Sequence, residues 1–175
     1  MKKQIAILLM FLMGLNFTFS QKSEVYNKLK SSIDYGKKAK EFANSTLNYV
    51  EKYYHRTSSD DVKSFIRNAK TEIDNANSKA ASAESDADDA GVKANKVNCG
   101  DAGRKANDAD GNFRTVKSRF DDAYAWFDQA QNEENIDDSE YKLRKAKSYV
   151  EDGIQYLNSA LRSLNEAIAE LNDCN

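Results

Sequence analysis

Residues 62–97 read VKSFIRNAKTEIDNANSKAASAESDADDAGVKANKV. Within this stretch, small or apolar side chains recur at alternating steps of four and three residues, which is a heptad pattern and predicts one long helix with a single packing stripe. The stripe consists of Val62, Ile66, Ala69, Ile73, Ala76, Ala80, Ala83, Ala87, Ala90, Ala94 and Val97. Because alanine dominates the stripe, a partner helix can approach it closely.

The same pattern resumes after the segment NCGDAG at residues 98–103 and continues to residue 130. The second stripe consists of Ala102, Ala106, Ala109, Phe113, Val116, Phe120, Ala123, Phe127 and Ala130. The phase breaks between Val97 and Ala102, and Gly100 followed by Asp101 indicates a helix stop and a new N-cap. We therefore expect the two helices to fold back on each other, with alanines of the first facing phenylalanines of the second.

One further heptad-patterned helix is expected on each side of this central pair. The stripe before it consists of Tyr26, Leu29, Ile33, Gly36, Ala43, Leu47, Val50 and Tyr54, with Lys40 as a polar interruption. The stripe after it consists of Leu143, Val150, Ile154, Leu157, Leu161, Leu164, Ile168 and Leu171, flanked by Ala146, Gly153, Ala160 and Ala167. Polar connectors at 55–61 and 132–140 supply Ser59, Asp60 and Asp137 as candidate N-caps.

The pattern as a whole predicts an all-α fold. Absence of proline from a chain of 175 residues with only seven glycines is consistent with long helices, which we expect at about residues 22–55, 59–98, 101–132 and 137–173. Because every connector is short, an up-down-up-down antiparallel four-helix bundle, packed like a coiled coil, is the preferred architecture for residues 21–175. The alternative to this closed monomer is an open pair of hairpins that completes its core by forming a homodimer.

The first twenty residues have a different character. Lys2 and Lys3 precede an apolar run at residues 5–19, and the small residues Thr18 and Ser20 fit the −3 and −1 positions of a cut before Gln21. This pattern predicts a cleavable signal peptide at residues 1–20. The run is shorter than the roughly 20 residues that span a bilayer, so we expect no stable membrane insertion after cleavage and an exported, periplasmic or secreted protein.

Cys99 and Cys174 are the two cysteines of the chain. Outside the cytoplasm such a pair is more often bridged than free. In an up-down-up-down bundle the second and fourth helices end at the same end of the molecule, which brings the two residues together. We therefore predict a disulfide between Cys99 and Cys174.

Composition and motifs argue against several functions. The 26 basic and 28 acidic residues are mixed along the chain without a basic cluster, so we expect no nucleic-acid partner. With His55 as the single histidine, the Glu-x-x-His pairs of a di-iron bundle cannot be built, and no metal or other cofactor is expected. The segment 108–112 begins like a calcium loop, but Phe113 stands where that loop needs glycine. Neither a nucleophile motif nor a phosphate-binding loop is present, so we expect no enzymatic activity.

Two roles fit this description. The first is a structural or protein-interaction module of the cell envelope or secreted space, which binds a protein partner not identified by the sequence. The alternative is a small-ligand sensor or carrier with an aromatic pocket between the first and last helices, although rings that seal a helix seam give the same pattern. The candidate ligand or partner contacts are Tyr35, Phe42, Tyr49, Trp126, Tyr149 and Tyr156.

Overall fold

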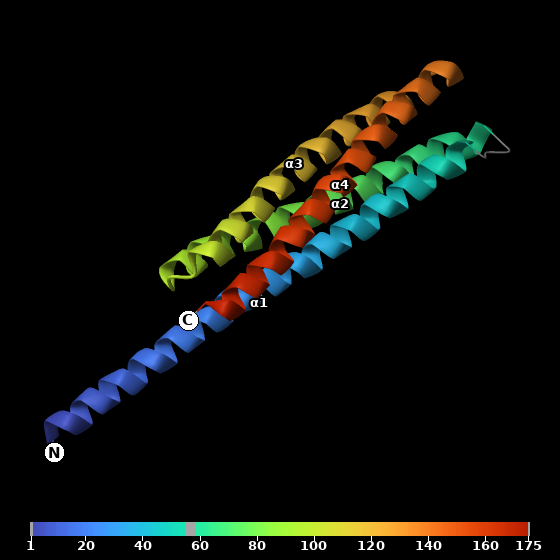
Figure 1. Cartoon of the computed structure of the whole chain (residues 1–175). Helices are drawn as coiled ribbons and strands as arrows, with labels where there is room; N and C mark the ends of the chain where they lie inside the picture. Colours follow the sequence, from blue (N-terminus) through green and yellow to red (C-terminus); the bar gives the residue numbers. More distant parts are fainter. Residues whose placement is uncertain (1, 55–58, 175) are drawn as a thin grey trace.

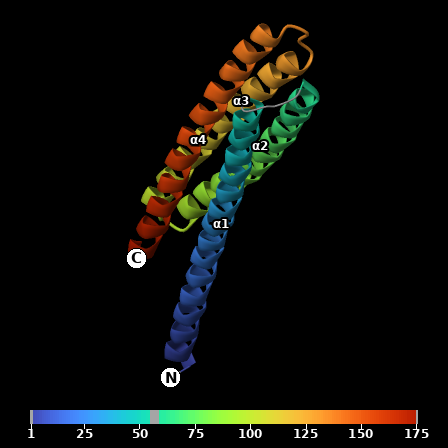
Figure 2. The same ribbon diagram turned by 90° about the vertical axis from the view of Figure 1, so that its right-hand side faces the viewer.

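The computed structural model describes the backbone of residues 2–54 and 59–174 and the side chains of residues 20–54 and 63–174. The chain forms four long helices, which are α1 (Lys2–Tyr54), α2 (Ser59–Lys96), α3 (Gly100–Gln131) and α4 (Ile136–Asp173). Consecutive helices pack against each other and α4 also contacts α1, so the predicted up-down-up-down four-helix bundle is confirmed (Figure 1). The α2–α3 turn and the end of α4 lie at one end, and the α3–α4 connector lies at the other (Figure 2).

Helix α1 begins earlier than the sequence predicts. It runs without a break from Lys2 rather than from residue 22, and its first part projects beyond the other three helices (Figure 1). Extending an existing helix is far easier than starting one, so the segment before residue 20, which is rich in leucine and methionine, continues α1 readily. No helix in the described part of the chain carries an apolar stretch that is long enough to cross a membrane.

The stripes of α2 and α3 form the core as expected. Every predicted stripe residue of α3 is buried, and so are the α2 stripe residues from Ile66 to Ala94. Val97 is half-buried, and the side chain of Val62 lies outside the described residues. The alternating four-and-three spacing therefore identified the packed face of both central helices.

The stripe of α4 is centred on slightly different residues than expected. Leucine and valine alternate there with small residues along the fully buried line. This line consists of Ser139, Leu143, Ala146, Val150, Gly153, Leu157, Ala160, Leu164, Ala167 and Leu171. Ile154, Leu161 and Ile168 lie beside it and are half-buried. The small residues that were expected at the flank are thus part of the core itself.

The predicted stripe of α1 is confirmed at Leu29, Gly36, Ala43 and Val50, and the predicted Ile33 is buried as well, but the predicted positions 26, 47 and 54 are one residue too late. The residues buried there at heptad spacing are Val25, Leu29, Ser32, Gly36, Ala39, Ala43, Thr46, Val50 and Tyr53. Ser32 and Thr46 hide this line in the sequence because both are polar. The Ser32 hydroxyl donates a 2.7 Å hydrogen bond to the Ala83 carbonyl of α2, and the Thr46 hydroxyl donates one of 3.1 Å to the Phe42 carbonyl. A buried hydroxyl is tolerated when it is hydrogen-bonded in this way.

The turn between α2 and α3 also differs from the expected one. Asn98, rather than Gly100, adopts the left-handed conformation, with φ 61°. The N–H of Cys99 donates to the Ala94 carbonyl at 2.9 Å and the N–H of Asn98 to the Asn95 carbonyl at 3.2 Å, which is the hydrogen-bond pair of a Schellman motif. Asparagine tolerates the left-handed region better than most residues, so it ends α2 here.

The N-caps also fall elsewhere than predicted. Cys99, not Asp101, is the N-cap of α3, and Asn135, not Asp137, is the N-cap of α4. The Asn135 side chain accepts hydrogen bonds from the N–H groups of Asp137 and Asp138. The backbone of α2 begins at Ser59, while the side chains of the candidate caps Ser59 and Asp60 lie outside the described residues.

Glu133 organises the α3–α4 connector. Its carboxylate accepts hydrogen bonds from the N–H groups of Glu134 and Asn135, at 3.1 and 3.3 Å, and pairs with Lys142 of α4. The Lys142 hydrogen bond, followed by the backbone hydrogen bond from Asn135, lowers the pKa of Glu133 from its ordinary value of 4.5.

This arrangement predicts a pH-dependent contribution of Glu133 to stability. Because folding lowers its pKa, the contribution is present above the unfolded-state pKa and is lost as pH falls through the lower folded-state value. Glu133→Gln should therefore lower the thermal midpoint near pH 7, and the difference from wild type should shrink towards pH 2. Thermal unfolding followed by circular dichroism measures this, with Glu134→Gln as the control. Equal pH profiles for the two variants would contradict the role of Glu133.

Two core glycines admit the phenylalanine rings of α3. A Cβ atom added to Gly153 of α4 would lie 2.4 Å from Cε1 of Phe120. One added to Gly36 of α1 would lie 3.1 Å from Cζ of Phe113. Both rings are fully buried, and each contributes about 1.5–3 kcal/mol by burial. The rings thus reach α1 and α4, two helices that the sequence did not pair with them.

Gly153→Ala tests this packing. Alanine is the better helix former, yet its methyl group overlaps the Phe120 ring, so the variant should lose about 1–3 kcal/mol of unfolding free energy. Gly111→Ala is the matched control, because Gly111 is exposed within α3 and a Cβ there meets no atom within 4 Å. That variant should gain about 0.5–1 kcal/mol. Urea titrations measure both changes, and stabilisation by Gly153→Ala would refute the packing described.

Candidate functional site

Three of the candidate rings lie along the seam between α1 and α2. Tyr35, Phe42 and Tyr49 recur at seven-residue intervals, so they occupy one row of α1, and all three are half-buried. Nζ of Lys79, on α2, lies 5.8 Å from the centroid of the Tyr35 ring. The row therefore faces α2.

The tyrosines of α4 face a different neighbour. Tyr149 and Tyr156 also share one row, and the guanidinium carbon of Arg119, on α3, lies 5.8 Å from the centroid of the Tyr149 ring. Tyr149 is half-buried and Tyr156 is 37% exposed. This row faces α3, so the structure does not bring the five rings together between α1 and α4.

Aliphatic side chains fill the α1–α4 seam instead. Cδ2 of Leu161 lies 3.0 Å from the position of a Cβ on Gly36, so the row of Leu161 faces α1. The half-buried members of this row are Ile154, Leu161 and Ile168. An ion pair between Lys147 and Glu51, with N and O 2.5 Å apart, crosses the same seam. Packed aliphatic side chains at this seam indicate a structural contact between the two helices.

Ion pairs between helices raise the pKa of three lysines. Hydrogen bonding to Glu51 raises the pKa of Lys147, and hydrogen bonding to Glu166 raises the pKa of Lys105. Lys28 of α1 behaves in the same way, because its hydrogen bonds to Asp86 and then Asp89 of α2 raise its pKa. Exposed pairs of this kind contribute little to stability, but they specify which helix faces lie opposite each other.

The segment that begins like a calcium loop is part of helix α3. The Asn112 side chain donates a 2.9 Å hydrogen bond to the Asp108 carbonyl, one turn earlier. Burial raises the pKa of the Asp110 carboxyl, and its hydrogen bond with Arg114 opposes that shift. Within residues 20–54 and 63–174, no three histidine, cysteine or acidic side chains group closely enough to hold a metal ion.

Trp126, the remaining candidate, lies near the α3–α4 connector. It is half-buried and makes an edge-to-face contact with Tyr141 of α4, with ring centroids 6.3 Å apart. Two large apolar residues with exposed surface lie at this same end, and we call them, with Trp126, the connector-end group. Its members are Trp126, Ile136 (54% exposed) and Tyr141 (51%). Tyr124 (41% exposed) is not a member, because it faces α2, where Nζ of Lys70 lies 4.9 Å from the centroid of its ring.

Sequence reasoning missed two members of this group, Ile136 and Tyr141. The signal for Ile136 was present, because it precedes Leu143 by one heptad and so occupies a stripe position beyond the last full layer of the core. Tyr141 carries no comparable signal, since exposed tyrosines on a polar helix face are common. Its contact with Trp126 follows only from the hairpin that α3 and α4 form.

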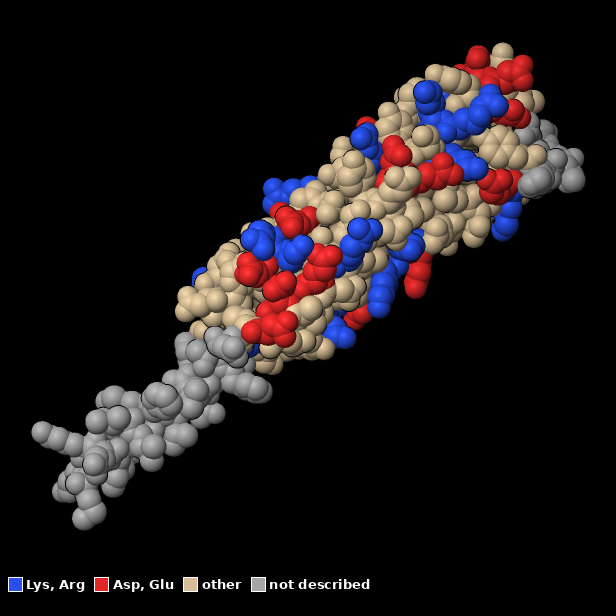
Figure 3. Space-filling view, viewed as in Figure 1, with Lys and Arg blue, Asp and Glu red and all other residues tan. Residues whose placement is uncertain are grey.

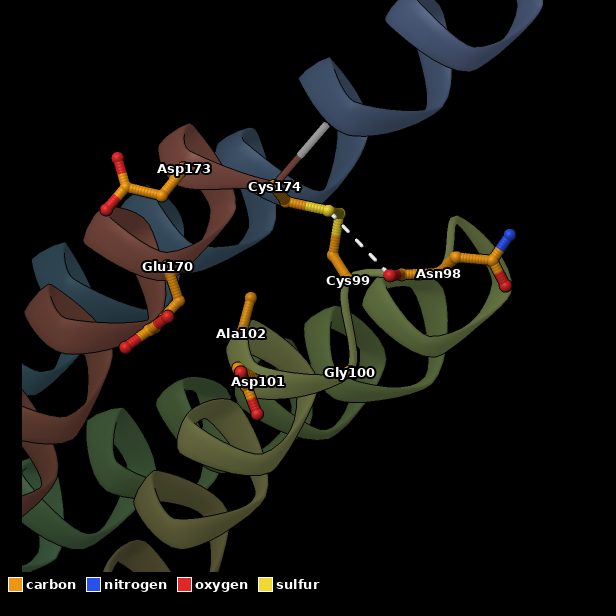
Figure 4. Close-up of a pocket in the computed structure, with 8 residues that line it drawn as sticks. All are labelled: Asn98, Cys99, Gly100, Asp101, Ala102, Glu170, Asp173 and Cys174. Atoms are coloured by element: carbon orange, nitrogen blue, oxygen red, sulfur yellow. Dashed lines mark hydrogen bonds between the residues drawn. A yellow bond between two sulfur atoms is a disulfide. The ribbon is translucent and has the colours of Figure 1, made fainter.

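The predicted disulfide is confirmed at the opposite end of the bundle. Cys99 and Cys174 are bonded, with Cα atoms 5.7 Å apart (Figure 4). The bridge joins the α2–α3 turn to the end of α4 and closes a loop with a sequence separation of 75. In the chain-entropy treatment such a loop stabilises the folded state by on the order of 4 kcal/mol.

The charged surface is mixed in sign. On the face shown in Figure 3, lysines and arginines alternate with aspartates and glutamates along the length of the bundle, without a large area of one charge. Comparisons with protein-family models and with curated proteins give no match. The geometry of the connector-end group and of the disulfide end therefore carries the functional argument.

Proposed function

We propose that this chain is an exported, non-enzymatic helical bundle that acts as a protein-interaction module of the cell envelope or secreted space. The connector-end group is the contact surface in this proposal. Its partner is a protein, because tryptophan and tyrosine side chains with both buried and exposed surface are typical of protein contacts.

The exposure of the connector-end group is the observation that carries the proposal. Ile136 is more than half exposed although it continues the buried stripe of α4. Tyr141 is equally open and has Trp126 packed against it edge to face. A partner that covers these side chains would remove apolar surface from water at about 25 cal/mol per Å².

The disulfide supports the exported location. Such bridges form and persist in oxidising compartments and are rare in the cytosol. Cys99 is 3% exposed and is held by the α2–α3 turn, so the fold itself positions it opposite Cys174. Together with the predicted signal peptide, this favours the periplasm or the secreted space.

Affinity capture tests the interaction. Protein that begins at residue 21 is immobilised and exposed to a native envelope extract, and the bound proteins are identified by mass spectrometry. The double variant Trp126→Ala/Tyr141→Ala should recover the partner at least about tenfold less well, because aromatic anchors carry much of the binding free energy of an interface.

Tyr26→Ala is the matched control for capture. Tyr26 is a similarly exposed tyrosine (36%) on α1, far from the connector-end group. It should bind as well as wild type, and circular dichroism should show all three proteins folded. Equal recovery by the double variant and Tyr26→Ala, or no specific protein with wild type, would contradict the proposal.

Export makes a separate prediction about the N-terminus. When the whole chain is expressed with a bacterial secretion system, N-terminal sequencing of the exported protein should begin at Gln21. Replacing Ser20 by Lys, which places a long charged side chain at the −1 position, should leave the leader attached. An exported protein that begins at Met1, or a chain retained in the cytoplasm, would refute cleavage there.

A further inference from the structure

The disulfide joins two residues that differ in accessibility. Cys99 is 3% exposed and is the N-cap of α3, while Cys174 is half-buried and is the C-cap of α4. A recess of about 250 Å³ is lined by both cysteines and by the first residues of α3 (Figure 4). A small molecule in this recess therefore reaches the bridge from the side of Cys174.

Packing around the last turn of α4 is weak. The recess at the disulfide lies on one side of it, and a second recess of about 410 Å³, lined by Tyr26 and Leu171 among others, lies on the other. Leu171, which is 5% exposed, is the last core residue of α4, whereas Glu170, Asn172 and Asp173 beside it are exposed. Packing of this turn therefore depends on one apolar side chain.

Local signals also disfavour this last turn. Glu170 and Asp173 place negative charge at the carboxyl end of the helix, where the helix dipole is unfavourable to it, and no basic residue lies in the turn. The noncovalent ties there are a hydrogen bond from Lys22 to the Cys174 carbonyl and, one turn earlier, the Lys105–Glu166 ion pair. The covalent bridge thus holds a segment that packing and helix signals hold only weakly.

We propose that the Cys99–Cys174 disulfide is a redox latch, whose reduction by a small thiol releases the last turn of α4 while the four-helix core stays folded. The rest of α4 keeps its full stripe of leucine, valine and alanine against α3 and α1, so opening stops within about two turns, as in other local unfolding reactions. Release uncovers Leu171 and the seam beside Ala102.

The exchange reaction proceeds in two steps. A thiolate of an external dithiol attacks Sγ of Cys174, forms a mixed disulfide and expels Cys99 as a thiolate. The second thiolate of the reductant then attacks the sulfur that the reductant contributed to the mixed disulfide. This releases Cys174 as a thiolate and leaves the reductant as a cyclic disulfide. Two electrons pass to the protein, and each cysteine thiolate takes up one proton from water.

The position of Cys99 favours it as the leaving group. Its thiolate forms at the amino end of α3, where the helix dipole stabilises negative charge and no side chain already caps the helix. The carboxylates of Asp101, Glu170 and Asp173 line the same recess, with Asp101 paired to Arg104 at 3.0 Å. This acidic lining repels an anionic thiol and attracts a cationic one.

Amide hydrogen exchange with mass spectrometry tests the latch. Oxidised protein is compared with protein reduced by dithiothreitol and alkylated, and with the variant Cys99→Ala/Cys174→Ser, which excludes an effect of the alkyl groups. In both the alkylated protein and the variant, the exchange rate should rise at least about tenfold at the end of α4 and in the α2–α3 turn. It should change little in the middle of the four helices. Unchanged exchange at the end of α4, or loss of protection throughout the bundle, would overturn the proposal.

The rate of reduction tests access to the bridge. At low ionic strength, cysteamine, a cationic monothiol, should open the bridge of the native protein to the mixed disulfide at least about tenfold faster than anionic mercaptoethanesulfonate, after correction for thiolate fraction. Added salt should narrow the ratio of the two rates. Equal rates at low salt, or reduction only in denaturant, would contradict a latch reached through the acidic recess. Because the latch and the connector-end group lie at opposite ends, failure of one proposal leaves the other intact.

Discussion

The ring of Phe120 lies against the backbone of Gly153, and the ring of Phe113 lies against Gly36. These two contacts place large side chains of α3 where α4 and α1 have none. The Phe120 contact lets α4 pack close beside α3, whereas Phe113 reaches across the centre of the bundle to α1, which packs against α2 and α4. Alanine on α2 completes the arrangement, because it lets α3 approach from the remaining side. When large residues on one helix face small residues on the others, the core reaches the packing density that is typical of folded proteins.

Much of the fold could be predicted from the sequence because the heptad spacing of α2 and α3 is carried by alanine and phenylalanine, which are apolar and unambiguous. Helix α1 was harder, since Ser32 and Thr46 occupy core positions and their burial depends on hydrogen bonds to carbonyl groups. Spacing alone carries no information about those partners. The prediction of the α2–α3 turn was wrong for a related reason. Asn98 and Gly100 both suit the end of a helix, and which of them ends α2 depends on the carbonyl groups that the next N–H groups reach.

The candidate site divides in the same way. The Cys99–Cys174 bridge followed from topology alone, because the direction of each helix fixes which ends meet. Predicting whether the aromatic rings share a pocket required more information, namely which flank of α1 faces α2 and which faces α4. A heptad pattern is compatible with either hand of the bundle, and the observed hand places Tyr35 beside α2 and Tyr149 beside α3. The position of Trp126 was identified, but its contact with Tyr141 emerges only from the α3–α4 hairpin.

Isotope-filtered nuclear Overhauser spectroscopy tests the central claim, which is that one chain closes its own bundle through these ring-to-glycine contacts. In uniformly labelled protein, the ring protons of Phe120 should show cross-peaks to the Hα protons of Gly153, and those of Phe113 to Gly36. In a sample mixed from labelled and unlabelled chains, the same cross-peaks should be absent between chains. Their absence within one chain, or their appearance between chains, would contradict the closed monomeric bundle.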